Sequence, residues 1–230
     1  MIQVEICTPS RRSAEAAKEG GAQRIELCRD LACGGLTPSD ADIEYCVRKL
    51  GLRTHVLVRP RPGDFCYSAD EVADIERTIL RCKALGVAAV VVGFLTADGQ
   101  IDVPLTRRMV QLAAPMEVTF HRAFDEARQE PLEALQSIIR CGCHRLLTSG
   151  QAHTALEGAE VIKRLVAYTR HILPTRFHIL AGSGVTSSNV RELVEKTGVD
   201  EVHGSCKTLM SDGTVQTNAE EVSRLIAQVK

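Results

Sequence analysis

Eight short apolar runs alternate along the chain with longer amphipathic stretches, and this alternation limits what the chain can fold into. The runs are rich in β-branched residues, which favour strands. They are QVEI (3–6), RIEL (24–27), THVLV (54–58), AAVVVGF (88–94), EVTF (117–120), HRLLT (144–148), FHILA (177–181) and EVHGS (201–205). Segments of helical character follow them, at residues 10–20, 39–51, 69–86, 105–114, 131–142, 155–168, 187–198 and 219–229.

This strand-then-helix order predicts an α/β fold, a parallel (β/α)8 or TIM barrel with its helices outside. A doubly wound open sheet is the alternative that the same alternation allows. No linker, low-complexity segment or charge run divides the chain. Its 230 residues therefore suit a single barrel domain over residues 1–230.

Charge and aromatic content argue against several classes of partner. The net charge is −1 and aromatic residues make up 3% of the chain, so we expect no nucleic-acid partner, which needs a basic surface or stacking rings. The longest apolar run, at 84–95, contains two glycines and is shorter than the roughly 20 residues of a membrane helix. We therefore expect no membrane partner. The absence of a secretory signal and an odd count of nine cysteines favour a cytoplasmic protein with reduced thiols.

Polar side chains interrupt the apolar runs, most plainly in VEIC (4–7) and IELC (25–28). Successive strand residues face opposite sides, and in a barrel the apolar set faces the helices. The polar set then points into the barrel, usually near the strand ends where barrel enzymes have active sites. It comprises Glu5, Cys7, Glu26, Cys28, His55, Arg59, Arg61, Thr119, His121, Glu201, His203 and Ser205.

Buried carboxylates such as Glu5 and Glu26 need compensating charges, because an unpaired buried charge is strongly unfavourable. We expect Arg59, Arg61 and Arg122 to supply them. The alternative is an internal salt-bridge cluster that only fills the barrel. Because buried ion pairs stabilise less than apolar packing does, a polar site at the barrel mouth is the preferred interpretation.

The loop RPRPGDF (59–65), after the third run, carries a candidate anion clamp. We expect Arg59, Arg61 and Asp64 to hold a carboxylate or phosphate through bidentate contacts. An ion pair that only holds the loop is the alternative.

The segment HRAFD (121–125), after the fifth run, carries the candidate acid–base group. His121 is the best candidate because an imidazole titrates near neutral pH. We expect Asp125 to orient it, and Glu26 or Glu5 to act as a partner base or as a ligand for a divalent metal.

Small residues follow the sixth and seventh runs, in TSGQ (148–151) and AGSGV (181–185). Their exposed backbone N–H groups suit an anion, although tight turns also need glycine. The full set of candidate substrate- or anion-binding residues is Arg59, Arg61, Arg122, Ser149, Gly182, Ser183, Gly184, His203 and Ser205.

Cys7 and Cys28 each follow an inward carboxylate by two residues, so both are expected to point inward on neighbouring strands. Neighbouring strands lie about 4.8 Å apart, and two thiolates at that spacing suit a soft ion such as Cu(I). Cys66 is a candidate third ligand, and CGCH (141–144) is a weaker candidate site at the opposite rim. Small buried thiols that only pack are the alternative.

Nine motifs occur in a fixed order between residues 2 and 205: VEIC, GGAQRIELC, GGLTPS, RPRPGDFCY, DGQID, TFHRAFD, LLTSGQ, AGSGV and EVHGS. In these motifs the chain resembles the CutC family of copper homeostasis proteins. The resemblance implies a TIM barrel, a cytoplasmic location and a homodimer or homotetramer. It also implies copper as a partner, with Cu(I) at Cys7 and Cys28. The residues that match the family pattern at the mouth are Glu5, Glu26, Arg59, Arg61, His121, Arg122 and His203.

Two functions remain open from the sequence. The first is a copper homeostasis protein that binds Cu(I) through Cys7 and Cys28 and uses no organic cofactor. The second is a lyase- or isomerase-type enzyme that acts on a small anionic or phosphorylated metabolite by acid–base chemistry.

Overall fold

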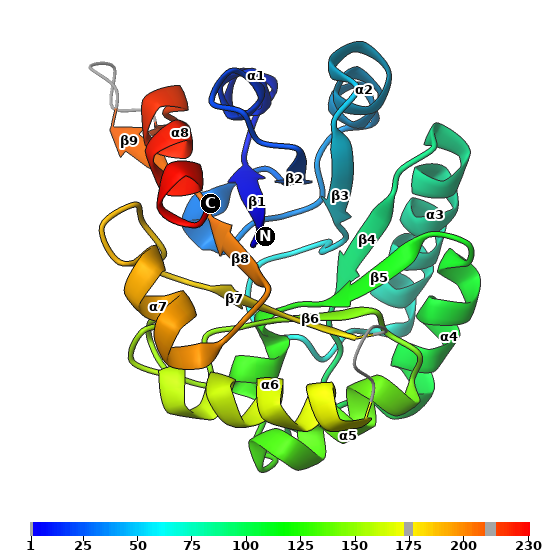
Figure 1. Cartoon of the computed structure of the whole chain (residues 1–230). Coiled ribbons are helices and arrows are strands. Elements are labelled where there is room, and N and C mark those ends of the chain that lie inside the picture. Colours follow the sequence, from blue (N-terminus) through cyan, green and yellow to red (C-terminus); the bar gives the residue numbers. More distant parts are fainter. Residues whose placement is uncertain (1, 173–176, 210–214) are drawn as a thin grey trace.

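The computed structural model describes residues 2–172, 177–209 and 215–230, and its centre is a closed barrel of eight parallel strands (Figure 1). Each strand pairs with its neighbours in sequence, and the first strand pairs with the eighth, so the open-sheet alternative is wrong. The TIM-barrel prediction is confirmed. The strands are β1 (Gln3–Thr8), β2 (Arg24–Leu27), β3 (Arg53–Leu57), β4 (Ala89–Val92), β5 (Glu117–Phe120), β6 (Arg145–Thr148), β7 (His178–Gly182) and β8 (Glu201–Gly204).

Eight α-helices of the described chain surround the barrel (Figure 1). Local signals set their ends: at one helix, Ser68 and Glu71 form a capping box, and Gly86 ends the helix with a φ of +79°. The helices are α1 (Arg11–Glu19), α2 (Asp40–Glu44), α3 (Ala69–Leu85), α4 (Val103–Ala113), α5 (Pro131–Arg140), α6 (Ala159–Ile172), α7 (Val190–Thr197) and α8 (Ala219–Gln228). A π-helical turn, Tyr45–Leu50, continues α2, and 3-10 turns cover Leu31–Cys33 and Arg122–Glu126.

Two features differ from the predicted elements. Helix α6 runs over Ala159–Ile172, about one turn later than the predicted 155–168, because residues 151–158 form turns. A two-stranded antiparallel sheet, β9 (Lys207–Leu209) with β10 (Val215–Thr217), follows β8 and was not predicted. Its strands are short, and their residues do not show the apolar alternation of the barrel strands.

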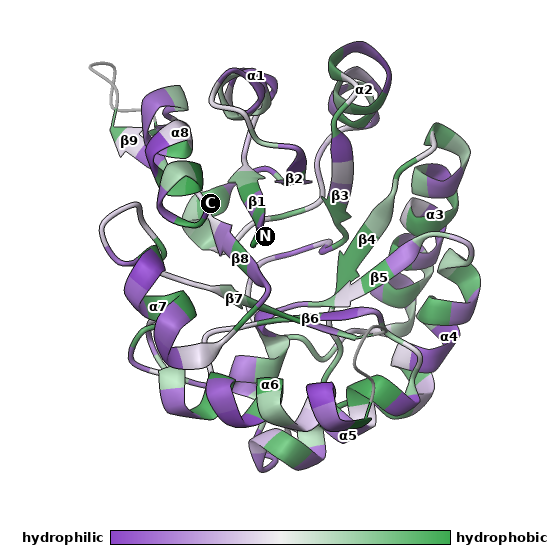
Figure 2. Cartoon of the chain, viewed as in Figure 1, coloured by the Kyte–Doolittle hydropathy of each residue, from purple (hydrophilic) through white to green (hydrophobic). Residues whose placement is uncertain are grey.

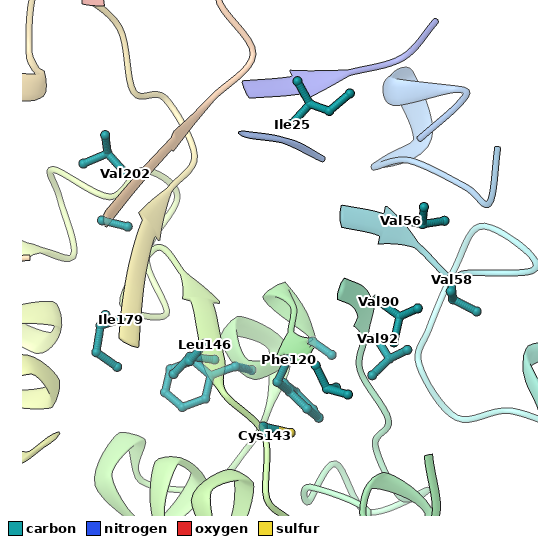
Figure 3. Packing of buried hydrophobic residues seen from close by; sticks show 14 of the residues in the cluster. Ile25, Val56, Val58, Val90, Val92, Phe120, Cys143, Leu146, Ile179 and Val202 are labelled. Carbon is teal, nitrogen blue, oxygen red and sulfur yellow. The ribbon is translucent and has the colours of Figure 1, made fainter. Parts of the chain in front are cut away.

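The main hydrophobic core lies between the barrel and the helices. Outward-facing strand residues such as Ile25, Val90, Phe120 and Val202 are fully buried there (Figure 3). Figure 2 shows β4 and β7 mainly in the hydrophobic colour, while the surrounding helices carry both colours. No described helix is both long and apolar enough to pass through a membrane.

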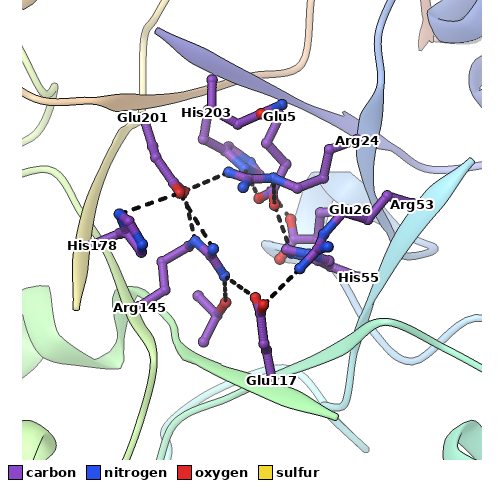
Figure 4. A network of polar contacts seen from close by, with 12 residues as sticks. Glu5, Arg24, Glu26, Arg53, His55, Glu117, Arg145, His178, Glu201 and His203 are labelled. Carbon is purple, nitrogen blue, oxygen red and sulfur yellow. Dashed lines mark hydrogen bonds and ion pairs between the residues drawn. The ribbon is translucent and has the colours of Figure 1, made fainter. Parts of the chain in front are cut away.

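The barrel interior, by contrast, contains a network of charged side chains, of which Arg24, Arg145 and Glu201 are buried (Figure 4). Glu201 accepts hydrogen bonds from Arg24 and Arg145, each at 2.6 Å. Arg145 also reaches Glu117 at 3.2 Å, and Glu117 pairs with Arg53 at 2.7 Å. The network therefore joins side chains of β2, β3, β5, β6 and β8 across the interior.

Candidate functional site

A cavity of about 730 Å³ opens at the carboxyl ends of the barrel strands. Eleven of the residues predicted from the sequence line it: Cys7, Glu26, Cys28, Arg59, His121, Arg122, Asp125, Ser183, Gly184, His203 and Ser205. Among the predicted residues that do not line it are Glu5, Arg61, Ser149 and Gly182. Strand alternation therefore placed most of the candidate residues at the cavity. Two of the exceptions, Arg61 and Ser149, lie in loops, where alternation does not predict the direction of a side chain.

Glu5 lies beneath the cavity rather than at its mouth. Its carboxylate is 2.9 Å from Arg24 Nε, 2.8 Å from His55 Nδ1 and 2.9 Å from His203 Nδ1. The expectation that Arg59, Arg61 and Arg122 would compensate this charge is wrong. Arg24 does so because it stands opposite Glu5 in the β1–β2 register.

These partners decide the charge of Glu5. Burial by itself would raise the pKa of the carboxyl, but His55, Arg24 and His203 together hold that pKa well below its ordinary value. Glu5 is thus an ionised structural charge held by ion pairs beneath the cavity, and it is unsuited to act as a general base there.

Two thiols meet at the cavity floor. Cys7 Sγ and Cys28 Sγ are 3.8 Å apart, and both side chains are buried. The separation far exceeds the roughly 2.05 Å of a disulfide, so both cysteines are free. Hydrogen bonding with Cys28, burial and the nearby Glu26 raise the pKa of the Cys7 thiol well above its ordinary value.

Glu26 and His203 join these thiols. Within the described ranges, one group of three potential metal-binding side chains is found, Cys7, Glu26 and His203, with donor atoms all within 4.8 Å of one another. Burial and the charge of Glu5 outweigh His203 and raise the pKa of Glu26. Burial opposes a charge on His203, yet the carboxylates of Glu26 and Glu5 raise its pKa.

The position of His203 differs from its predicted role. It was a candidate for anion binding, but its ring lies between two carboxylates, with Nδ1 2.9 Å from Glu5 and Nε2 3.5 Å from Glu26. The two carboxylates beside the ring would repel a bound anion. This position therefore favours a protonated ring, or a neutral ring that binds a metal ion. The cavity floor thus combines two thiols, a carboxylate and an imidazole.

The two arginines of the loop after β3 have different environments. Arg59 is buried and lines the cavity, and its guanidinium donates to the carbonyls of Cys33, Gly35 and Gly63. Arg61 does not line the cavity, and its guanidinium pairs with Glu71 and Asp64. The proposed Arg59–Arg61 clamp is therefore not assembled in this structure, and Arg61 instead takes the alternative role of holding the loop.

His121 lines the cavity, but not as a neutral-pH acid–base group. Burial and the neighbouring Arg59 lower the pKa of the ring to about 3. Its Nδ1 accepts a hydrogen bond from the backbone N–H of Ala123 at 3.1 Å. The expectation that Asp125 orients this ring is wrong, since the carboxylate of Asp125 bonds instead to Arg122 and to the loop after β6.

Asp125 instead organises the loop after β6. Its carboxylate accepts hydrogen bonds from Thr148, Ser149 and the backbone N–H of Gln151, and it pairs with Arg122 at 2.8 Å. Ser149 is fully buried, and its hydroxyl is hydrogen-bonded within this cluster. Arg122 is left about half-exposed at the rim.

The small residues after β7 and β8 divide in the same way. Ser183 and Gly184 line the cavity with φ values of +85° and +71°. Ser205 also lines it. Gly182 does not line the cavity. A Cβ at Gly182 would lie 2.6 Å from Leu147 Cδ1, so this glycine allows close packing inside the barrel.

The remaining cysteine candidates do not reach the thiol pair. Cys66 is exposed and lies outside the cavity lining. Cys141 and Cys143 of CGCH are buried in the apolar core, and His144 Nδ1 accepts a backbone hydrogen bond from Val118. Cys141 and Cys143 therefore match the packing alternative.

Several lining residues were missed by the sequence argument, among them Cys33, Phe65, Glu126, Cys206 and Glu221. Most of them come from loops or from α8, where no strand alternation indicates direction. Arg24, which compensates Glu5 beneath the cavity, was also missed, although it stands two residues before the inward Glu26 on the same strand and alternation predicts its direction.

Sequence comparison identifies close relatives of this chain. A CutC family protein from Vibrio vulnificus (strain CMCP6) is 48% identical over 208 residues, which cover 90% of this chain and 81% of the relative. A CutC family protein from Chromobacterium violaceum is 46% identical over 204 residues, which cover 89% of this chain and 81% of the relative.

Structural comparison agrees. A structure of CutC from Streptococcus agalactiae, named as a copper homeostasis protein, matches with a TM-score of 0.83 and 31% identity, covering 89% of this chain and 99% of the other. Phosphoribosylanthranilate isomerase from Thermotoga maritima, at 14% identity and a TM-score of 0.62, shares the barrel fold and covers 99% of this chain and 98% of its own. The model of the CutC family matches residues 2–208. The chain therefore belongs to the CutC family.

Proposed function

We propose that this CutC family protein works in copper homeostasis by binding Cu(I) at Cys7 and Cys28. The single observation that carries this proposal is the buried pair of thiols 3.8 Å apart at the floor of the cavity. Cu(I) is a soft ion that prefers sulfur ligands, so the donor set fits it. Copper is here the cargo of the protein.

Glu26 and His203 extend the donor set of the proposed copper site. Both lie with Cys7 in one group of donor atoms within 4.8 Å. The imidazole is a common partner of copper, whereas the carboxylate is a hard ligand and suits an outer position, where it orients the others. The cavity provides the entry path for the ion.

The proposal includes location and assembly. We place the protein in the cytoplasm as a homodimer or homotetramer, as the family resemblance implies. All nine cysteines of the chain are free in the structure, which fits a reducing compartment.

A second candidate function is favoured by the size of the cavity. About 730 Å³ is far more space than one copper ion needs and falls within the range of small-molecule sites. The candidate is an enzyme that acts on a small anionic metabolite, with Arg59 and His121 on the cavity wall.

The copper proposal is tested by anaerobic titration of the reduced protein with Cu(I) against a competing chelator. We expect one tightly bound Cu(I) per chain. Cys7→Ser and Cys28→Ser should each weaken binding by more than the roughly 10- to 100-fold typical of outer-shell changes, because each removes a sulfur ligand. Glu26→Gln should weaken it less.

Cys66→Ser is the matched control, because it removes an exposed thiol outside the cavity lining. This variant should bind Cu(I) as the wild type does. Undiminished one-to-one binding in Cys7→Ser, or weak binding that falls equally with every cysteine removed, would contradict the proposal.

A further inference from the structure

Arg59 carries a buried positive charge that has no opposing carboxylate. Its residue is 6% exposed. Its recorded hydrogen bonds go to the backbone carbonyls of Cys33, Gly35 and Gly63, and no acidic side chain in the described part of the chain lies within ion-pair distance of it. Burying a charge without a counter-charge is unfavourable. Because Arg59 lines the cavity, an anionic ligand can supply that counter-charge.

His121 lines the same cavity and has an unused donor. Its Nδ1 accepts the N–H of Ala123, so the proton of the neutral ring is on Nε2. Nε2 is buried and has no hydrogen-bond partner among the residues described. With its pKa lowered to about 3, the ring is neutral at physiological pH and serves as a donor there. An oxygen of a bound ligand would satisfy it.

Phe65 and Gly93 hold these two groups in place. The ring centroids of Phe65 and His121 lie 4.8 Å apart. The guanidinium carbon of Arg59 lies 4.9 Å from the ring centroid of Phe65. A Cβ on Gly93 would lie 2.3 Å from the ring of His121, so the imidazole packs directly on the end of β4. Both donors are therefore preorganised before a ligand arrives.

We propose that Arg59 and His121 form a carboxylate subsite on the β3–β5 side of the cavity. The guanidinium supplies the opposing charge, and His121 donates a hydrogen bond from Nε2 to a ligand oxygen. This inference rests on the second candidate function and names its substrate class, a small molecule with one carboxylate. It also changes the role of His121 from acid–base group to neutral donor.

The charges around the cavity favour a carboxylate over a phosphate. The lining includes the acidic residues Glu26, Asp125, Glu126 and Glu221, against the basic residues Arg59, Arg122 and the exposed Lys207. Arg122, at the rim, is already paired with Asp125. A phosphate monoester carries about −1.5 to −2 at pH 7 and would face these acids with a single unpaired buried arginine. A carboxylate matches that arginine in charge and in planar shape.

The test uses the reduced, metal-free protein, so that it is independent of copper. Acetate, propionate and lactate are titrated separately, with inorganic phosphate in parallel, while the histidine ring nitrogens are followed by 15N NMR. His121→Phe identifies the signal of His121. We expect a saturable shift of its Nε2–H resonance with a carboxylate and a weaker response to phosphate.

Three variants locate the subsite. Arg59→Met should abolish saturable binding, and His121→Phe should weaken it by about tenfold, the effect of one hydrogen bond. Arg61→Met is the matched control in the same loop, since Arg61 pairs with Glu71 outside the cavity lining, and it should bind as the wild type does.

Several outcomes would overturn the inference. The first is the absence of a saturable shift in the wild type with every carboxylate up to about 50 mM, a concentration far above a millimolar Kd. The second is tighter binding of phosphate than of any carboxylate. The third is undiminished carboxylate binding in Arg59→Met. The wild-type titration keeps the test decisive if Arg59→Met fails to fold. Saturable binding of acetate supports the subsite, because acetate is a probe of binding and not a substrate. Turnover of a larger carboxylate metabolite is measured separately and tests the enzymatic candidate function.

Discussion

At His121, burial and a neighbouring guanidinium act in the same direction. Both disfavour the imidazolium form, and the pKa of the ring falls to about 3 from an ordinary value of 6.5. A histidine at an inward strand end is a natural candidate for acid–base chemistry when only the sequence is known. In the folded protein the same residue is a neutral hydrogen-bond donor, because its ring is buried and Arg59 lies beside it.

This shift makes folding depend on pH. Below about pH 6.5 the unfolded chain binds a proton at His121, whereas the folded chain does so only near pH 3. Stability from this residue is therefore lost as pH falls through that window. The unfolding free energy of the wild type should fall by about 2 kcal/mol more than that of His121→Gln between about pH 7 and pH 5. This follows from about 1.4 kcal/mol per pH unit for one proton taken up on unfolding.

Urea denaturation at each pH measures this difference. Ser223→Ala is the control, since Ser223 is exposed on α8 and carries no titratable group, and its pH dependence should follow that of the wild type. Parallel curves for His121→Gln and the wild type would show that the ring titrates alike in the folded and unfolded chains, and the assignment as a neutral donor would then be lost.

At the scale of elements, the join between α1 and α8 depends on the absence of one side chain. Gly20 ends α1 with a φ of −72°, which any residue can adopt. A Cβ there would nevertheless lie 2.5 Å from the carbonyl oxygen of Ala219 and 2.6 Å from Val222 Cβ. The glycine is therefore needed for close approach of the first and last helices.

Gly20→Ala should destabilise the protein by about 1–3 kcal/mol, the range for an overpacked contact, even though alanine favours helix. The change is measured by urea denaturation at neutral pH. Glu19→Ala, an exposed change one residue earlier, should stay within about 0.5 kcal/mol of the wild type. Equal stability of Gly20→Ala and Glu19→Ala would contradict this account of the join.

At the scale of the whole molecule, charged groups inside the barrel connect strands that are far apart in sequence. Glu201 of β8 is bonded to Arg24 of β2 and to Arg145 of β6, and Arg145 reaches Glu117 of β5 (Figure 4). The salt-bridge alternative considered from the sequence is thus realised, but beneath the cavity. The polar mouth lies above it, so both interpretations hold at different depths.

Removing one partner from this network should be costly, because it leaves buried charges short of compensation. Arg145→Met should reduce the unfolding free energy by about 3 kcal/mol or more. Arg164→Ala breaks an exposed pair with Glu130 and should reduce it by less than about 1 kcal/mol. Both values are obtained from urea denaturation at neutral pH.

A double variant separates lost charge pairing from lost packing. In the Arg145→Met background, Glu201→Gln removes the carboxylate charge that has lost its partner. Glu201→Gln should therefore lower the unfolding free energy much less in that background than in the wild type. Simple additivity of the two changes would show that the two side chains do not act as a pair.

The sequence by itself determined the barrel and most of its elements. Strand β5 was predicted at its observed bounds, and the inward direction of Glu26, Cys7 and Cys28 followed from alternation. The physical reason is local: strand periodicity and helix ends depend on neighbouring residues. The order of eight such units then leaves few ways to bury their apolar faces.

Only the tertiary structure decided the depth and the partners of the polar groups. Register placed Arg24 against Glu5, and the loop after β3 separated Arg59 from Arg61. The same packing set Arg59 beside His121 and changed the chemistry of that ring. These outcomes depend on distances between residues remote in sequence and on burial, which together set the charge and the partners of each side chain.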